Sequence, residues 1–280
     1  MAIGDSSAVY SEKRVFSQHQ SALTLLQHQF SKVLNDNYLW LDLAAGKGQI
    51  ISSLEDIINP SIMPKIVYHA FDANQIFLDV AMVKASKIDL KADRFIGQME
   101  NFPRLVDETP QYNFVSLINV VHEIGPYLFA EVLFEALIRL KEDGVIYVYD
   151  MEAIDPLEVG ALPLNQLEVL KILETFYSSL GTSLTPNVSK WQHSTTTSWN
   201  FTISIKDLNV SRDSLKENKD QIISSTRQFI QVLIEEKFTR CIRQLDLYTK
   251  HQTELVGDDA SKIRLLYEFW ALNRLRGVSV

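Results

Sequence analysis

The sequence predicts an α/β fold with a doubly wound, mostly parallel β-sheet, N-terminal helices and a helical C-terminal extension. Short apolar runs alternate with longer amphipathic segments through the first half of the chain, which is the pattern of strands joined by crossover helices. Several runs are almost continuously apolar and β-branched, as in parallel strands buried on both faces. Beyond residue 150 the pattern changes to a helix, an alternating strand and charged helical segments.

The expected elements follow in chain order. Apolar side chains at helical spacing over residues 11–34 predict an N-terminal helical cap, residues 1–37. The next domain, residues 38–210, begins with strands over residues 38–43, 66–71, 94–96, 114–120 and 145–149. Between them, residues 49–58, 75–87 and 128–141 are long enough for crossover helices.

The second half of this domain holds a helix over residues 164–180 and then a strand pair. Trp199, Phe201 and Ile203 alternate with polar residues, which predicts a half-buried strand that pairs antiparallel with residues 188–193. Trp191 and Trp199 are interpreted as a packed cross-strand pair. Residues 211–280 form the helical extension, which we expect to pack on the domain.

Composition narrows the class of protein. The 280 residues carry a net charge of −8, which disfavours a broad nucleic-acid interface because phosphate affinity needs clustered cations. The single cysteine, Cys241, excludes a disulfide framework or a cysteine-rich zinc site and favours a reducing cytoplasmic compartment. We expect no metal site, no secretory signal and no membrane-spanning segment.

The turn after the first strand indicates a ligand site. Residues 41–50 run from an apolar strand through small residues into a helix, as in nucleoside-binding turns. Gly46 and Gly48 would let the backbone approach a ligand without a Cβ in the way. A dinucleotide site would place a third glycine where Ile51 stands, and Asp42 would repel a pyrophosphate. The same charge suits a cationic ligand.

The end of the second strand supplies an acid for a ribose. Asp72 follows Gly48 at roughly the spacing of ~20 residues at which such an acid accepts hydrogen bonds from ribose hydroxyls. Its alternative role is the N-cap of the next helix. Because both roles would compete for the same oxygens, we predict that Asn74 is the cap and that Asp72 is the ribose ligand.

As an ordered set, residues 41–50, 71–74, 95–103 and 114–124 resemble the motif series of class I S-adenosylmethionine (SAM)-dependent methyltransferases. The resemblance covers residues 38–150 and departs from the family at Ala44, where a glycine is usual, and at Gln98, where an aspartate usually contacts the adenine amino group. It implies SAM as the cofactor and a methyltransferase-type sheet. The cofactor-binding residues that it implies are Asp42, Ala44, Gly46, Gly48, Asp72, Ala73, Gln98, Met99, Asn119 and Val120.

In this family methyl transfer is a direct displacement at the sulfonium, so a base is needed only for an acceptor that is protonated. His122 follows the fourth strand at the ligand-binding edge and is a candidate base or a structural contact. Asp150 leaves the fifth strand at the same edge and would bind the acceptor or begin a solvated loop. His193 is a third candidate, beside the aromatic strand pair.

The resemblance implies a SAM-dependent methyltransferase, and the acidic net charge and the aromatic residues near His193 favour a small-molecule acceptor over a nucleic acid. The alternatives are a SAM-binding regulatory protein without turnover and another SAM-using enzyme, a lyase or an aminopropyltransferase. A nicotinamide-dependent oxidoreductase is disfavoured by Asp42 and Ile51. The extension is expected to serve as a lid, a core element or the surface for a homodimer or protein partner.

Overall fold

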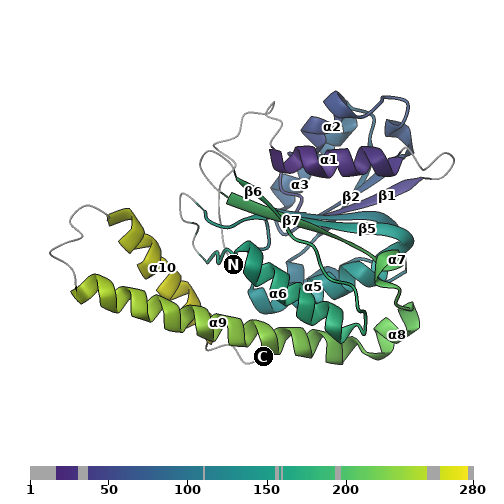
Figure 1. The fold of residues 1–280 in the computed structure, drawn as a ribbon. Helices are drawn as coiled ribbons and strands as arrows, with labels where there is room; N and C mark the ends of the chain where they lie inside the picture. Colours follow the sequence, from purple (N-terminus) through teal and green to yellow (C-terminus); the bar gives the residue numbers. More distant parts are fainter. Residues whose placement is uncertain are drawn as a thin grey trace.

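A computed structural model describes residues 17–30, 37–109, 111–154, 158, 160–192, 197–250 and 259–276. These residues form a seven-stranded β-sheet with helices on both faces (Figure 1). The strand order is β3-β2-β1-β4-β5-β7-β6, so the winding of the chain reverses between β1 and β4. The predicted doubly wound, mostly parallel sheet is confirmed.

The strands are mostly parallel and mostly buried. All neighbouring pairs among the first five strands are parallel, whereas β7 runs antiparallel to β5 and β6 runs antiparallel to β7. The central strands β1 and β4 are buried over almost their whole length because helices cover them on both sides. The bounds are β1 (Tyr38–Leu43), β2 (Ile66–Asp72), β3 (Lys91–Ile96), β4 (Tyr112–Ile118), β5 (Leu140–Met151), β6 (Ser189–Gln192) and β7 (Thr197–Ser204).

Two apolar clusters fill the space on either side of the sheet. One lies under α1 (Ser17–Phe30), α2 (Ile51–Ile57) and α3 (Gln75–Lys87). The other lies under α5 (Pro126–Arg139), α6 (Gln166–Ser179) and the long α9 (Lys219–Lys250). The remaining helices are η2 (Met63–Lys65), η3 (Met99–Asn101), α4 (Phe102–Leu105), α7 (Ile205–Leu208), α8 (Arg212–Glu217) and α10 (Asp259–Arg276).

Side-chain caps fix where two of the crossover helices begin. The Asn74 side chain accepts from the backbone N–H groups of Ile76 and Phe77 at the start of α3, so the predicted cap is confirmed. At α6, Asn165 and Glu168 form a reciprocal capping box. Of the predicted N-terminal cap, residues 17–30 form α1, and the other residues of that segment up to residue 36 lie outside the described part.

The strand pair β6–β7 forms as predicted, but the predicted packing of Trp191 against Trp199 is wrong. The register places Trp191 opposite Ser198, and Lys190 opposite Trp199. Because a shift of one residue reverses the face of a strand, the two indoles point to opposite sides of the sheet. Trp199 is buried against Phe201 and donates its indole N–H to a backbone carbonyl, whereas Trp191 is 51% exposed.

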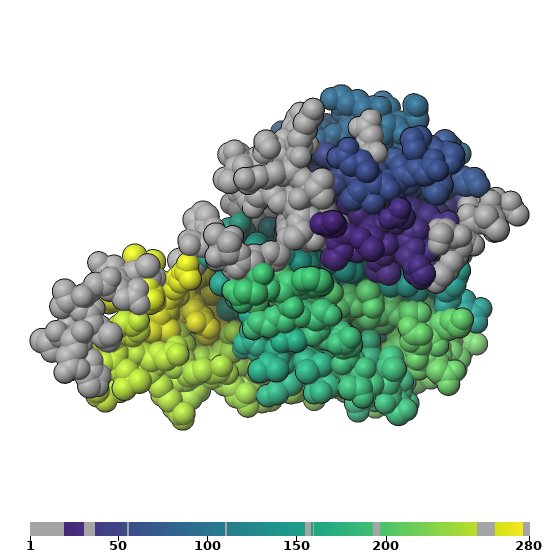
Figure 2. Space-filling model, turned by 45° about the horizontal axis from the view of Figure 1, so that its top comes forward, coloured from purple at the N-terminus to yellow at the C-terminus, as the bar shows by residue number. Residues whose placement is uncertain are grey.

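The C-terminal extension shares the core of the sheet domain. Apolar residues of α9 and α10 belong to the same cluster as the residues under α5 and α6. The buried Lys237 ammonium on α9 lies 2.9 Å from both carboxylate oxygens of Glu168 on α6. Beyond this contact α9 and α10 continue as an antiparallel arm (Figures 1 and 2). Among the described residues, no helix combines the length and apolarity needed to cross a bilayer.

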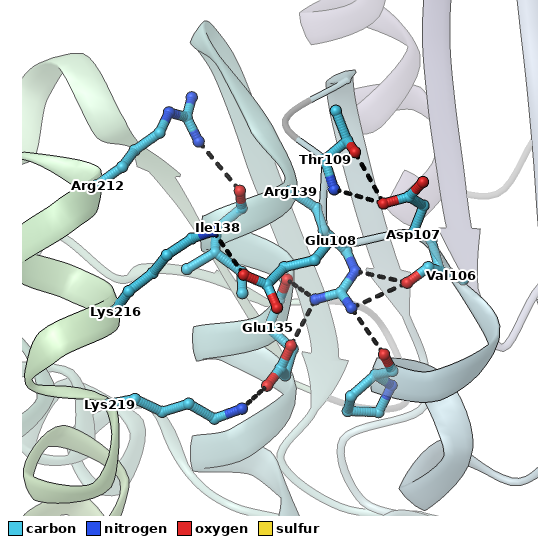
Figure 3. A network of polar contacts seen from close by, with 11 residues as sticks. Val106, Asp107, Glu108, Thr109, Glu135, Ile138, Arg139, Arg212, Lys216 and Lys219 are labelled. Atoms are coloured by element: carbon cyan, nitrogen blue, oxygen red, sulfur yellow. Dashed lines mark hydrogen bonds and ion pairs between the residues drawn. The ribbon is translucent and has the colours of Figure 1, made fainter.

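A buried arginine joins the start of the extension to the sheet domain (Figure 3). Arg139, at the end of α5, is 1% exposed and donates to the backbone carbonyls of Pro103 and Val106. Its guanidinium also lies 2.5 Å from a carboxylate oxygen of Glu135, whose other oxygen pairs with Lys219 of α9. The network satisfies the buried charge and ties α9 to the edge of the sheet. The boundary predicted at residue 210 stays a prediction.

Candidate functional site

Two non-glycine residues with left-handed backbones flank the point where the strand order reverses. Ala44 follows β1 with φ 58°, and Asn119 follows β4 with φ 55°. The strands pair directly, with Leu43 opposite Leu117, so both residues lie at the same carboxyl edge. A left-handed backbone costs roughly 1–2 kcal/mol in a residue such as alanine and less in asparagine. Such strain gathers at ligand sites, and this edge is where open α/β sheets bind ligands.

The turn after β1 is hydrogen-bonded to the acid at the end of β2. The Gly46 N–H donates to one Asp72 carboxylate oxygen at 2.8 Å, and the Asn74 N–H donates to the other at 2.8 Å. The Ala45 N–H donates to the carbonyl of Phe71. Asp72 therefore lies beside the turn, as expected of a group that binds a nucleoside there, and each of its oxygens retains room for a further donor.

The space available for a side chain differs between the two glycines of the turn. Gly46 has φ 54°, and a Cβ there would meet mainly the Gln49 side chain. Gly48 has φ 64°, and a Cβ there would lie 3.0 Å from the Cβ of Ala81 on α3. A ligand was the expected reason for a glycine at position 48. The structure shows a second reason, which is the close packing of the turn against α3.

Asp42 belongs to a buried polar network inside the sheet. Its carboxylate oxygens accept from the Tyr68 hydroxyl at 2.8 Å and from the Ser116 hydroxyl at 2.6 Å. The Trp40 indole N–H donates in turn to Ser116. Burial raises the pKa of Asp42 to about 6, the two hydrogen bonds oppose the rise, and the nearby Asp72 adds to it. An ionised Asp42 would therefore be stabilised by a cation at this edge.

The other predicted cofactor residues lie along the ends of β2, β3 and β4. Ala73 is exposed after β2, Gln98 precedes η3, and Met99 and Val120 are buried. The Asn119 N–H donates to the carbonyl of Tyr149 on β5. The Asn119 amide oxygen Oδ1 is buried and accepts no hydrogen bond from the described residues. Such an atom costs roughly 1–3 kcal/mol unless a bound molecule donates to it.

A histidine with three carboxylates forms the second part of the site. His122 is 3% exposed, and its Nδ1 lies 2.6 Å from Oδ1 of Asp150. The other Asp150 oxygen accepts from the His122 backbone N–H at 2.9 Å. On the far side of the ring, Nε2 lies 3.7 Å from Oε1 of Glu123 and 3.5 Å from Oε2 of Glu158. Two predicted catalytic residues are thus in contact, and two further acids join them.

The charges of this cluster perturb one another. Burial alone would lower the pKa of His122, but the carboxylates of Asp150, Glu158 and Glu123 outweigh it and raise the pKa to about 10. Burial raises the pKa of Glu123 to about 7 against the opposing effect of His122. By itself the cluster holds an imidazolium, which donates hydrogen bonds and has no lone pair for a proton.

Sequence reasoning passed over two members of this cluster. Nothing in the sequence assigns a role to Glu123, although it follows the candidate His122 directly and lies before α5, which begins at Pro126. Glu158 lies in a segment without periodicity, and no sequence signal pointed to it. The third predicted catalytic residue, His193, lies outside the described residues.

Comparison with known proteins places the fold. No family model and no curated protein matches the sequence. Among solved structures, the CurJ carbon methyltransferase matches with a TM-score of 0.52 and 16% identity over 66% of this chain and 54% of that one. The DszA carbon methyltransferase matches with a TM-score of 0.52 and 16% identity over 72% and 56%. This chain thus spans little more than half the length of either. The chain has the class I methyltransferase fold that the sequence resemblance implied.

Proposed function

We propose that this chain is a SAM-dependent methyltransferase that acts on a small-molecule acceptor. The observation that carries the proposal is the pair of left-handed residues, Ala44 and Asn119, on either side of the switch point between β1 and β4. Strain in two non-glycine residues at the ligand-binding edge of a doubly wound sheet is expected where the backbone is shaped around a bound molecule.

The charges at this edge favour SAM over a dinucleotide. Burial raises the pKa of Asp42, and the nearby Asp72 carboxylate adds to the rise. A pyrophosphate would add negative charge to this pair, whereas the ammonium and sulfonium of SAM would supply the missing positive charge. We therefore place the methionine end of SAM toward Asp42 and the ribose toward Asp72.

The hydrogen-bonding groups suit the same orientation. Asp72 is held by two backbone N–H groups and can accept further bonds from the ribose hydroxyls. The unpaired Oδ1 of Asn119 would accept from a donor of the cofactor, such as the ammonium. Binding SAM would thereby remove the cost of one buried, unpaired atom.

The chain's contribution to methyl transfer would be alignment and exclusion of water. His122 follows β4 and Asp150 is one of the last two residues of β5 at the same edge, on the side where the acceptor would approach the methyl group. Asp150 accepts from the backbone N–H of His122 with one carboxylate oxygen and contacts the ring nitrogen Nδ1 with the other, which holds the imidazole in one orientation. The pair would fix a polar group of the acceptor, and the net charge of −8 favours a small molecule over a nucleic acid.

Calorimetric titration with SAM and S-adenosylhomocysteine tests the cofactor assignment, with NADH as the negative control. We expect micromolar binding of both adenosyl ligands and a loss of about tenfold or more in Asp72→Asn, since hydrogen bonds to a charged group contribute about 1.5–3 kcal/mol. Asp79→Asn is the matched control because Asp79 is an exposed acid on α3 that pairs with Arg94. Equal affinities of the three proteins for SAM would contradict the assignment.

Turnover needs a separate assay. The protein is incubated with SAM labelled in the methyl group and with pools of small hydroxylated, amino and carbon-acid compounds, and transfer of the label is measured. Labelled product above the level of Asp72→Asn supports the enzyme. Tight SAM binding with no product from any pool would favour the alternative of a SAM-binding regulatory protein.

A further inference from the structure

The cluster at His122 contains three potential ligand atoms that converge on one point. They are Nε2 of His122 and one carboxylate oxygen each of Glu123 and Glu158, and all of them lie within 4.8 Å of one another. The two distances from Nε2 are 3.7 Å to Glu123 and 3.5 Å to Glu158. Both are too long for good hydrogen bonds, so the three atoms face one another across a small gap.

The size of this gap matches a coordinated metal ion. Nitrogen and oxygen ligands lie about 2.0–2.2 Å from a tetrahedral Zn²⁺, which separates any two of them by about 3.4 Å. The two measured separations from Nε2 are close to this value. Small movements of the glutamate side chains would complete the geometry.

The histidine is already oriented as metal-bound histidines are. Asp150 occupies the Nδ1 side of the ring, which leaves Nε2 directed at Glu123 and Glu158. A carboxylate on one ring nitrogen and a metal on the other is the common arrangement, because the carboxylate fixes the tautomer and raises the basicity of the ligand nitrogen. His122 is 3% exposed, so this direction is set by packing.

Glu158 supplies independent support. Its Oε2 is buried, yet it accepts no hydrogen bond from the described residues. The described residues around it are tied to the site, because the Leu162 N–H donates to the carbonyl of His122, and the Tyr267 hydroxyl of α10 donates to the carbonyl of Glu158 and lies 3.2 Å from that of Ala161. This oxygen lies 3.5 Å from Nε2 of His122, which is too far for a good hydrogen bond, so a metal ion between the two atoms would satisfy it better than the histidine alone.

We propose that His122, Glu123 and Glu158 bind one divalent transition-metal ion, of the class Mn²⁺, Fe²⁺, Co²⁺ or Zn²⁺. A mixed imidazole and carboxylate set favours these ions over Mg²⁺ and Ca²⁺, which prefer oxygen ligands alone. Three protein ligands leave at least one coordination position open. In the methyltransferase proposed above, that position would take an oxygen of the acceptor, and this last assignment alone rests on the proposed function.

Titration of the full-length, chelator-treated protein with Co²⁺ tests the site without SAM. The visible absorption bands of Co²⁺ report its coordination geometry, and we expect them to saturate at one ion per chain. Glu158→Gln and His122→Ala should each weaken Co²⁺ binding by tenfold or more. Asp150→Asn should weaken it by about 10–100-fold through the orientation of His122. Glu152→Gln is the matched control, because Glu152 follows β5 nearby but pairs with Lys190 and accepts from the Gln166 N–H at the start of α6.

Each Co²⁺ result tests the metal site separately from the SAM site. Saturable bands that are lost in Glu158→Gln and kept in Glu152→Gln support it, provided that circular dichroism shows both variants folded. Absence of bands in the unmodified protein, or equal Co²⁺ affinity in Glu158→Gln, overturns it. Because Co²⁺ and SAM are titrated separately, a protein that binds one and not the other shows which of the two proposals has failed.

Discussion

Replacing Asp42 by asparagine should stabilise the protein at neutral pH and weaken its binding of SAM. In the folded protein burial raises the pKa of this carboxyl from 3.8 to about 6. At 1.36 kcal/mol per pKa unit, ionising the buried group costs about 3 kcal/mol more than ionising it in the unfolded chain. Asparagine has nearly the same shape and carries no charge. The pKa of about 6 already includes the hydrogen bonds from Tyr68 and Ser116, and poorer bonds from these hydroxyls to the asparagine amide offset part of the gain, which leaves about 1–3 kcal/mol.

The sign follows from proton linkage. Below the pKa of Asp42 in the unfolded chain, this carboxyl is protonated in both the folded and the unfolded state, so its ionisation does not lower the free energy of unfolding. As the pH rises the unfolded chain ionises first, so the free energy of unfolding falls until the folded group also ionises near pH 6. The variant lacks this titration. Its stability relative to the unmodified protein should therefore improve by about 3 kcal/mol between about pH 4 and about pH 8.

Urea denaturation of both proteins across this pH range measures the difference directly, and Asp56→Asn on the exposed face of α2 serves as the control. A difference in unfolding free energy that stays constant with pH would refute the reasoning. Calorimetry on the same samples gives the second half of the prediction. SAM affinity should fall in Asp42→Asn and, in the unmodified protein, should rise as the pH passes through about 6.

Three further predictions concern stability and use thermal or urea denaturation. Ala44→Gly relieves a left-handed backbone at φ 58° and should add about 1 kcal/mol, a rise in Tm of roughly 2–4 °C; an unchanged or lower Tm would contradict the strain. Gly48→Ala forces a Cβ against α3 and should lower the free energy of unfolding by about 2–3 kcal/mol. Gly125→Ala, which has open space around its added Cβ, should lower it by under about 1 kcal/mol, and similar losses in the two variants would be inconsistent with the packing. Lys237→Met leaves the buried carboxylate of Glu168 unpaired and should cost about 3–5 kcal/mol, much of which the added Glu168→Gln change should restore.

The sheet could be predicted from the sequence because each of its determinants is local. Parallel strands buried on both faces are apolar runs, and the Asn74 cap is a short-range signal that the structure confirms. The alternation over β7 gave the correct inward face for Trp199. The pairing of Trp191 failed because register depends on the turn between the strands, which periodicity does not specify.

The site was only partly predictable, because its chemistry depends on contacts between distant segments. The approach of Asp72 to Gly46 follows from the order of β1 and β2, which the resemblance implied. The packing of Gly48 on Ala81 depends on how α3 lies against the turn. Glu158 reaches His122 only through tertiary contacts of its own segment, and a single glutamate in an aperiodic stretch gives no warning of such a role.

Tyr267 gives the last helix a part in the site that its distance along the chain conceals. Its hydroxyl holds the carbonyl of Glu158, 109 positions earlier, and so fixes one wall of the carboxyl edge. A fragment cut after β7 would keep every strand of the sheet and still lack that wall. The same cut would remove the part of the apolar core that α9 and α10 supply, so the carboxyl edge and the extension have to be studied as one folding unit.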